Sequence, residues 1–332
     1  MRDESTTDSS SGLSASPVPY WPADLPREIV VPETNLWHNL EVSAARFPTK
    51  PLVIFFGRAF SFSEIRSQAE AIAGWLQQEA AVRKGHRVLL CMQNCPQFMV
   101  ACYGILRAGA VVVPVNPMNK AEELKHYILD TKASVAIYGS ELDGEIESAN
   151  ARLAGDQRLK HRLATHYEEA CIHDHDGPAD APPAWILARH ELAPGVVHWQ
   201  DALSRAHVPD AVCSRADDLA IMPYTSGTTG LTKGCMHSHR TVMHTAVGGG
   251  RWLSIGPECT VLAVLPLFHG TGMVYGMHGP IYNGSTVIMM PRWDRALAGR
   301  LISHYRITHW TNISTMIVDL LSSPSAAKFD LS

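Results

Sequence analysis

Residues 224–234 read Tyr-Thr-Ser-Gly-Thr-Thr-Gly-Leu-Thr-Lys-Gly, and an apolar run at residues 219–223 directly precedes them. That run predicts a strand, and a helix is expected from about His239. The stretch offers glycines that let the backbone curl at Gly227, Gly230 and Gly234. It also offers the hydroxyls of Thr225, Ser226, Thr228 and Thr229, and the ammonium of Lys233. Backbone N–H groups, hydroxyls and an ammonium are donors that can hold a polyphosphate. The stretch therefore predicts a phosphate-binding loop between a strand and a helix.

Two other interpretations of this stretch are weaker. A flexible Gly/Ser/Thr linker would not be expected between a strand and a helix with a lysine at its end. A P-loop NTPase requires G-x-x-x-x-G-K-[ST]. Gly227 and Lys233 have that spacing, but Thr232 stands where the pattern needs glycine and Gly234 stands where it needs Ser or Thr. The loop is therefore not a Walker motif.

Strands and helices are expected to alternate on both sides of the loop. Ser61 and Glu64 form a capping-box pattern, Pro96 and Gly109 would bound a second helix, and Asn119 with Glu122 would cap a third. One face of the first helix would carry Ile65, Ala69, Ile72 and Leu76. Strands are expected at residues 87–92, 110–115, 134–138, 219–223, 260–265, 285–290 and 308–312, and later helices around 273–282, 296–305 and 316–321. Residues 141–200 look less regular.

Continuous apolar strands are typical of parallel sheets that helices cover on both faces. The expected fold is therefore α/β, with two packed αβ subdomains and largely parallel sheets. We expect a disordered tail at residues 1–26, which are small, polar and proline-rich, a first subdomain at 27–215, and a second at 216–332 that contains the phosphate-binding loop.

Composition limits the class of protein. The 332 residues are 46% hydrophobic and 18% charged, with a formal net charge of −4. This charge gives no global field for nucleic acid, so no nucleic-acid partner is expected. The N-terminus lacks the basic start and apolar core of a signal peptide, and no apolar run reaches the roughly 18–20 residues of a membrane span. We expect a soluble, cytoplasmic protein; peripheral membrane contact and oligomeric state stay open.

Neither the cysteines nor the histidines of the sequence indicate a metal site. The seven cysteines include no C-x-x-C pair, which favours reduced, mostly buried thiols. His173, Asp174, His175 and Asp176 lie in a proline-rich stretch. Adjacent ligands in such a loop rarely close a coordination shell, so a solvated loop is the favoured interpretation.

The loop closely resembles the signature of the adenylate-forming (AMP-binding) superfamily, which includes acyl-CoA synthetases, luciferases and peptide-synthetase adenylation domains. Where the usual signature has proline, this chain has Thr232, a mild departure. Further similar motifs stand in the same order and extend the resemblance over about residues 35–332: VVVPVNP at 111–117, HSHR at 237–240, LPLFHG at 265–270 and GSTVIMMPRWD at 284–294.

The resemblance implies an AMP-forming acid–thiol ligase that uses ATP, Mg²⁺ and coenzyme A. A small-molecule carboxylic acid, most simply a medium- or long-chain fatty acid, would attack the α-phosphate, and a thiol would then displace AMP. The catalytic residues would be Lys233, His269 and Thr225, and the nucleotide's phosphates would contact Thr225, Ser226, Gly227, Thr228, Thr229, Gly230 and Lys233. His269 would lie by the acyl pocket, or serve as a structural histidine. Residues 270–282 and 311–316 would line the acyl site; no residue is assigned to a metal.

The later family motifs, which hold adenine and ribose and supply a C-terminal catalytic lysine, do not occur in these 332 residues. Residues 138–141, Tyr-Gly-Ser-Glu, only imitate one of them, and residues 328–332 resemble the lead-in to the adenine-binding strand. We therefore expect an incomplete enzyme, inactive by itself. The alternatives are an aryl-acid or carrier-protein-directed ligase, or a non-catalytic homologue. The glycines at 248–250 have no role that the sequence explains.

Overall fold

The computed structural model describes residues 21–22, 24–172, 181–225 and 232–331. The chain forms two compact units, Met1–Val30 and Val31–Ser332. In the first unit the indole N–H of Trp21 donates to the carbonyl of Leu25 at 2.8 Å. Most of the tail expected at residues 1–26, and His173 to Asp176, lie outside the described residues. No described helix has both the length and the apolar character needed to span a membrane.

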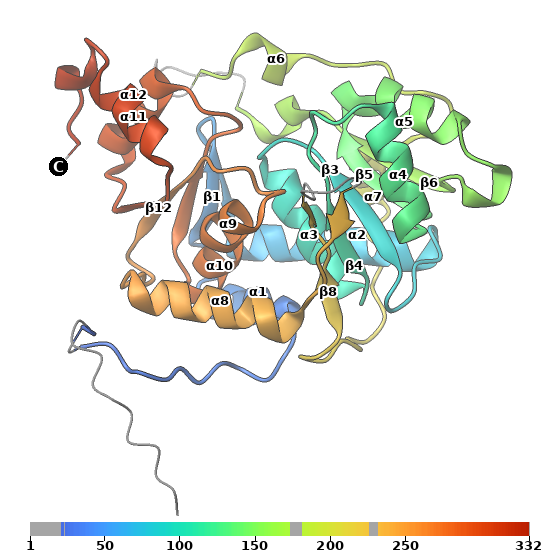
Figure 1. Cartoon of the computed structure of the whole chain (residues 1–332), viewed down its shortest axis with the longest axis horizontal. Helices are drawn as coiled ribbons and strands as arrows, with labels where there is room; N and C mark the ends of the chain where they lie inside the picture. Colours follow the sequence, from blue (N-terminus) through green and yellow to red (C-terminus); the bar gives the residue numbers. More distant parts are fainter. Residues whose placement is uncertain (1–20, 23, 173–180, 226–231, 332) are drawn as a thin grey trace, which may run out of the picture. The chain divides into compact units, whose positions relative to one another are not determined.

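Two sheets organise the second unit (Figure 1). The first has the strand order β14 (His309–Trp310), β12 (Thr260–Ala263), β13 (Thr286–Met289), β1 (Pro51–Phe55) and β2 (Arg58–Ser61). The second has the order β11 (His237–Ser238), β8 (Leu219–Ile221), β4 (Val111–Pro114), β3 (Arg87–Cys91), β5 (Val135–Gly139), β6 (His161–Thr165) and β7 (Val197–His198). Of the eleven strand pairs within the described ranges, eight are parallel, which confirms the predicted fold class.

The two sheets do not divide the chain at residues 215 and 216. Strand β1, from the start of the unit, pairs with β13, so that Val53 lies opposite Val287. Strand β8 follows the expected boundary but pairs with β4, with Ile221 opposite Val112. The expected boundary followed the order of the sequence. In the structure, β1 from the first part of the chain belongs to the five-stranded sheet, and β8 from the second part belongs to the seven-stranded sheet. Sequence periodicity identifies strands but contains no information on which strands pair.

Helices cover both faces of the seven-stranded sheet. In β3 the side chains of Val88 and Leu90 belong to the core shared with the five-stranded sheet, and Leu89 and Cys91 belong to a second core on the opposite face. The first core is built with α1 (Leu36–Arg46), α2 (Phe62–Gln78), α3 (Pro96–Arg107), α8 (His239–Trp252) and α10 (Gly279–Asn283). The second is built with α4 (Ala121–Thr131) and α5 (Asp143–Ala151). Buried strands with apolar residues on both faces are what the continuous apolar runs predicted.

The predicted helix starts are confirmed for α2 and α3. The Ser61 hydroxyl accepts from the N–H of Glu64 at 3.1 Å, and α3 begins at Pro96. The cap predicted for the next helix is wrong by one residue. Lys120 is the N-cap of α4, and the Glu123 carboxylate accepts its N–H at 2.6 Å. Asn119 does not cap α4; its amide nitrogen donates to the Tyr127 hydroxyl at 2.8 Å.

The segment expected to be irregular contains more structure than its sequence indicated. Helix α5 and strand β6 lie within residues 141–200, followed by the short helices α6 (Ala184–Leu187) and α7 (Trp199–Ser204). The sequence of α5 is mostly polar, with Ile146 and Ala149 buried, so its apolar face was too narrow to recognise. Tertiary packing against the second core, rather than periodicity, accounts for this helix.

The remaining predicted elements are present. These are helices α11 (Arg295–Tyr305) and α12 (Ser314–Leu321), and the helical stretch expected around residues 273–282. That stretch is longer than predicted and consists of α9 (Gly270–Met273), a π-helical turn at Val274–His278, and α10. A π-helical turn is rare and often occurs at functional sites.

Candidate active site

A short hairpin brackets the signature stretch. Strand β9 (Tyr224–Thr225) pairs antiparallel with β10 (Lys233–Gly234), so that Thr225 lies opposite Lys233. The N–H of Cys235 extends the pairing by donating to the carbonyl of Pro223 at 2.8 Å. Directly opposed residues of an antiparallel pair have neighbouring side chains. The structure therefore brings together Thr225 and Lys233, two of the residues predicted to contact phosphate, and leaves both exposed.

The other predicted phosphate contacts, Ser226, Gly227, Thr228, Thr229 and Gly230, lie outside the described residues. They fall between the two strands of the hairpin in the sequence. Their role therefore stays a prediction from the sequence.

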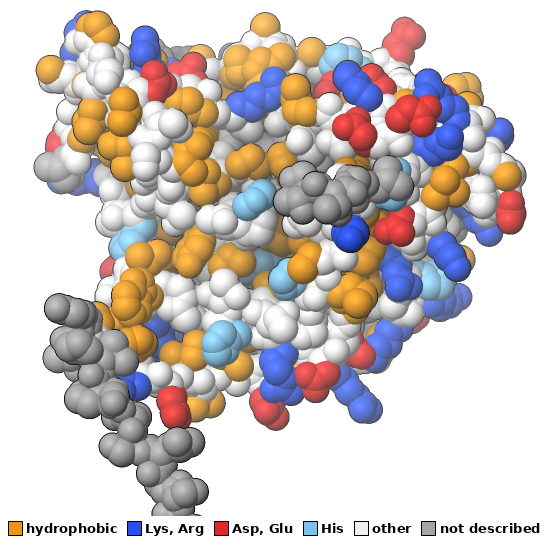
Figure 2. Space-filling view, viewed as in Figure 1, with side chains coloured by type: hydrophobic (Ala, Val, Ile, Leu, Met, Phe, Trp, Pro, Cys, Tyr) orange, Lys and Arg blue, Asp and Glu red, His pale blue; other side chains and the backbone are white. Residues whose placement is uncertain are grey.

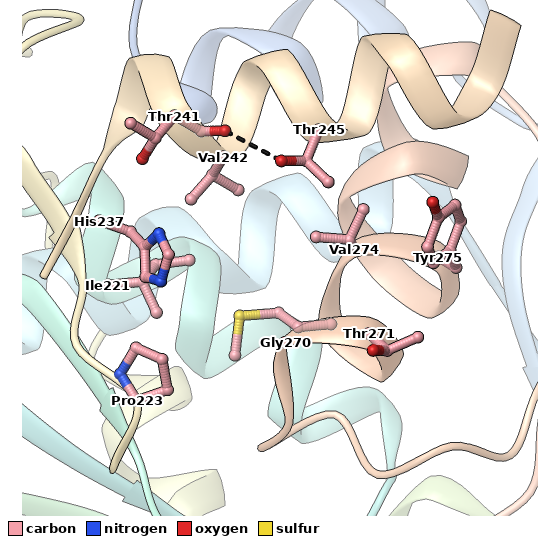
Figure 3. A pocket seen from close by; sticks show the side chains of 11 residues that line it. Ile221, Pro223, His237, Thr241, Val242, Thr245, Gly270, Thr271, Val274 and Tyr275 are labelled. Atoms are coloured by element: carbon pink, nitrogen blue, oxygen red, sulfur yellow. Dashed lines mark hydrogen bonds between the residues drawn. The ribbon is translucent and has the colours of Figure 1, made fainter. Parts of the chain in front are cut away.

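An apolar cavity of about 270 Å³ lies beside the hairpin (Figure 3). One wall comes from the segments on either side of the hairpin, a second from α8 and a third from α9 and the π-helical turn. The lining residues are Ile221, Pro223, His237, Thr241, Val242, Thr245, Gly270, Thr271, Met273, Val274 and Tyr275. Figure 2 shows apolar side chains and histidines at the surface in the middle of this face of the molecule. The cavity can accept an apolar group beside the hairpin that carries Thr225 and Lys233.

The acyl-site residues predicted from the sequence only partly line this cavity. Five residues between 270 and 275 do so, whereas Met277, His278 and Ile281 are buried in the core. Residues 311–316 do not line this cavity; they lie at and before the start of α12. Their neighbours Trp310 and Ile317 line a separate groove.

His269 lies next to the cavity wall that α9 forms. It is the N-cap residue of α9, and its Nδ1 accepts from the N–H of Thr271 at 3.4 Å. The side chain is exposed, and the cavity lining begins at the next residue, Gly270. The geometry gives His269 a structural contact and a place near the cavity, so its catalytic role stays a prediction.

The glycine run in α8 accounts for the position of one cavity wall. A Cβ atom on Gly249 would lie 2.6 Å from Cε1 of Tyr275, and one on Gly250 would lie 2.5 Å from Nδ2 of Asn283. Both distances are too short for a side chain at these positions. The glycines therefore let the π-helical turn and α10 pack tightly on α8, with Tyr275 in the cavity wall.

Asn94 is a buried residue of this region that sequence reasoning missed. Its Nδ2 donates to the carbonyls of Leu265 and Met290 at 3.1 and 3.2 Å, and its Oδ1 accepts from the N–H of Leu267 at 2.8 Å. These bonds link the carboxyl end of β3 to the segment that leads into His269. A polar residue three positions after a buried strand was the available signal, because ligand sites gather at the carboxyl ends of parallel strands.

Two buried histidines on the elements that line the cavity, His239 in α8 and His278 in the π-helical turn, are neutral core residues. Burial lowers the pKa of His239 to about 4 and that of His278 to about 3. His239 accepts from the N–H of Leu36 through Nδ1 at 3.1 Å, and His278 Nδ1 lies 3.0 Å from the Tyr103 hydroxyl. Both histidines therefore serve packing between helices rather than the cavity.

Apart from Cys235, which directly follows β10, the cysteines and Glu141 of the sequence analysis belong to other segments than the hairpin. All seven cysteines are free; five are buried, as expected, and Cys213 and Cys235 are exposed. Burial raises the pKa of Cys171 to about 12. Glu141 lies at the end of β5, where the Tyr167 hydroxyl donates to it at 2.6 Å and burial raises its pKa. Among the described residues, no group of three or more His, Cys, Asp or Glu side chains is placed to hold a metal.

Comparison with known protein families identifies the family of this chain. Residues 40–332 match the family described as AMP-binding enzyme. The chain belongs to this family. This confirms the family resemblance inferred from the signature stretch and its accompanying motifs.

Curated relatives of this AMP-binding family member are named as CoA ligases. A long-chain-fatty-acid–CoA ligase of Bacillus subtilis (strain 168) is 29% identical over 326 residues, which cover 94% of this chain and 56% of the relative. The enzyme of the same name from Escherichia coli O157:H7 is 30% identical over 337 residues, with the same coverage. A 4-coumarate-CoA ligase 2 of Narcissus pseudonarcissus is 27% identical, with 83% of this chain and 46% of the relative covered. The chain spans about half the length of these curated relatives.

Solved structures confirm the fold of the family. An anthranilate CoA ligase, AuaEII, in complex with anthranoyl-AMP superposes with a TM-score of 0.76 at 23% identity, covering 93% of this chain and 54% of that one. The N-terminal domain of FACL13 from Mycobacterium tuberculosis superposes with a TM-score of 0.73 at 23% identity, covering 90% of this chain and 67% of that domain.

Proposed function

We propose that this chain is the part of an AMP-forming acid–thiol ligase that holds the acid and the phosphates of ATP. The enzyme would activate a carboxylic acid as acyl-AMP and transfer the acyl group to coenzyme A. The observation that carries the proposal is the continuity between hairpin and cavity. Pro223 and His237 line the apolar cavity, and the hairpin with Thr225 and Lys233 lies between them in sequence. A carboxylate at the cavity mouth would therefore lie near phosphates bound at the hairpin.

The chemistry follows from the donors at this site. A carboxylate oxygen would attack the α-phosphorus of ATP, the bond to the bridging oxygen would break, and pyrophosphate would leave. The ammonium of Lys233 would stabilise the charge on the β- and γ-phosphates, and the Thr225 hydroxyl would donate to a phosphate oxygen. In the second step the sulfur of coenzyme A would attack the acyl carbon, its proton would pass to solvent, and AMP would leave.

Magnesium would accompany the nucleotide and neutralise phosphate charge when bound. Mg²⁺ is usually held by the phosphates of its nucleotide, water and one or two carboxylates. The described part of the hairpin supplies the Thr225 hydroxyl and the Lys233 ammonium and no carboxylate. We therefore assign no metal ligand to this chain.

The acid is proposed to be a medium- or long-chain fatty acid. The cavity lining supports an apolar acid, because Ile221, Val242, Met273 and Val274 contribute to it. The names of the Bacillus subtilis and Escherichia coli relatives support a fatty acid. An aryl acid is the second candidate, because the rings of Tyr275 and His237 lie in the lining and could pack against an aromatic ring.

The test is exchange of labelled pyrophosphate into ATP by the purified chain, with octanoate, palmitate or benzoate added in turn. Acid-dependent exchange that Lys233→Ala abolishes would support the role of the hairpin and overturn the expected inactivity of the chain by itself, and the preferred acid would define the substrate class. Lys125→Ala, on a helix away from the cavity lining, serves as the matched lysine control and should keep the exchange. Exchange that does not depend on Lys233 would contradict the role given to the hairpin. No exchange with any acid would show that this chain alone does not perform the first step.

A further inference from the structure

Both arms of the hairpin contact one face of helix α4, through Tyr224 in β9 and through Thr232 directly before β10. His126, Tyr127 and Asp130 form this contact surface, which we call the α4 clamp; none of them was assigned a role from the sequence. His126 and Asp130 are four residues apart and so lie on the same side of the helix. The clamp lies on the face of the seven-stranded sheet that carries the second core, where Tyr127 is buried.

The first arm of the hairpin is held through Tyr224. Its hydroxyl donates to the carboxylate of Asp130. Its ring lies 4.5 Å, centroid to centroid, from the ring of Tyr127, and 6.0 Å from the imidazole of His126 in an edge-on arrangement. Tyr224 is directly followed by Thr225, the first of the predicted phosphate contacts. The clamp therefore fixes the backbone at the beginning of the signature stretch.

The second arm is held through the backbone of Thr232. The carbonyl oxygen of Thr232 lies 3.1 Å from Nε2 of His126. A carbonyl oxygen can only accept, so His126 must carry a proton on Nε2 and donate it. Thr232 directly precedes Lys233. The clamp therefore also fixes the backbone at the residue whose ammonium is proposed to bind phosphate.

We propose that His126 is a positioning residue for the phosphate-binding segment. It would act through the carbonyl of Thr232 and not by touching the nucleotide. With Asp130 and Tyr127 it holds both arms of the hairpin on one rigid helix, so that Lys233 is oriented before the phosphates arrive. Preorganised donors bind charge without having to be ordered at the moment of binding. This inference rests on the proposed function, because it assumes that the hairpin binds phosphate.

The test compares four variants of the purified chain with the parent chain and with Lys233→Ala. His126→Ala removes the donor; His126→Gln restores it, since the amide nitrogen of glutamine reaches about as far as Nε2. His126→Asn is a shorter amide that does not reach, and Lys125→Ala is a control on the same helix. Two quantities are measured for each: the affinity for ATP by calorimetry, and the hydrogen-exchange rate of the Cys235 amide, which donates to Pro223 at the base of the hairpin.

We expect His126→Ala and His126→Asn to weaken ATP binding about fivefold to tenfold and to speed exchange of the Cys235 amide about as much, the loss of one hydrogen bond. His126→Gln and Lys125→Ala should match the parent chain. Unchanged values in His126→Ala, or equal values in the Gln and Asn variants, would overturn the inference. Failure of the proposed function looks different, because the parent chain and Lys233→Ala would then bind ATP equally poorly, while the exchange rates would still decide whether the clamp exists.

Discussion

Tyr275 packs so closely on Gly249 that any side chain at position 249 would collide with its ring, at 2.6 Å from Cε1. Since Tyr275 lines the cavity, the contact sets the position of one cavity wall. The glycine run in α8 is therefore a packing requirement of the site, although the sequence offered no explanation for it.

Gly249→Ala should destabilise the fold, by roughly 1–3 kcal/mol, because Tyr275 must move to make room. The free energy of unfolding can be measured by urea denaturation. Gly144→Ala in α5 is the matched control, because nothing lies within 4 Å of the added Cβ there. The control should be neutral or stabilising, by up to about 1 kcal/mol, from helix propensity. Equal effects at the two positions would show that the contact with Tyr275 is relaxed in solution.

Asn94→Ala should cost roughly 2–4 kcal/mol, because the carbonyls of Leu265 and Met290 and the N–H of Leu267 lose their partner in a buried place. Asn94→Asp should be at least as harmful although it is nearly the same shape, because a carboxylate cannot donate to the two carbonyls. Urea denaturation of both variants measures the effect. If the free energy of unfolding falls by less than about 0.5 kcal/mol in either variant, water replaces these hydrogen bonds.

The buried histidines should make stability depend on pH. An unfolded histidine titrates near 6.5, whereas burial holds the folded pKa of His239 at about 4. Between these values the unfolded state binds more protons, so stability rises with pH, is complete above about 6.5, and falls as the solution is acidified. The contribution of His239 over this window is roughly 3 kcal/mol.

His239→Asn isolates this effect, since the amide oxygen can still accept from the N–H of Leu36 but does not titrate. Unfolding free energies measured from pH 4.5 to 7.5 should therefore show a shallower slope for the variant than for the parent chain. Identical slopes would place the acid sensitivity in other groups.

The two arms of the hairpin should contribute separately to nucleotide affinity. Tyr224→Phe keeps the ring against Tyr127 but removes the hydroxyl that donates to Asp130, so ATP affinity should fall a few-fold. The loss should add to that of His126→Ala if the arms are independent. Calorimetry on the two single variants and the double variant measures this. A double variant no weaker than His126→Ala would mean that the arms act as one unit.

Local sequence patterns predicted most of the fold. Capping at Ser61, the proline at the start of α3 and the buried apolar strands specify elements through neighbours in the sequence, and the structure confirms them. Helix α5 could not be found in this way, because its apolar face is narrow and its stability comes from packing. The sheet to which β1 and β8 each belong could not be predicted either, because strand pairing depends on residues far apart in the sequence.

Sequence reasoning proposed site residues only where the type of side chain indicates a chemical role. Thr225 and Lys233 stood out because hydroxyls and an ammonium within a glycine-rich stretch match phosphate. His126 and Asn94 did not, because one acts on a backbone carbonyl and the other on segments more than 150 residues away. No rule of sequence spacing connects His126 with Thr232 or Asn94 with Leu265, so these contacts can be recognised only in the folded structure.

The pairing of Val53 with Val287 has a consequence for synthesis of the chain. Strand β1 leaves the ribosome early, yet its parallel partner β13 is made near the end of these residues. Until then the β1–β2 hairpin exposes an unpaired, apolar edge, while the seven-stranded sheet already has its last strand, β11, at His237–Ser238. Such late, non-local pairing slows folding and exposes intermediates to aggregation. Nascent chains that stall between β11 and β13 should therefore depend on chaperones.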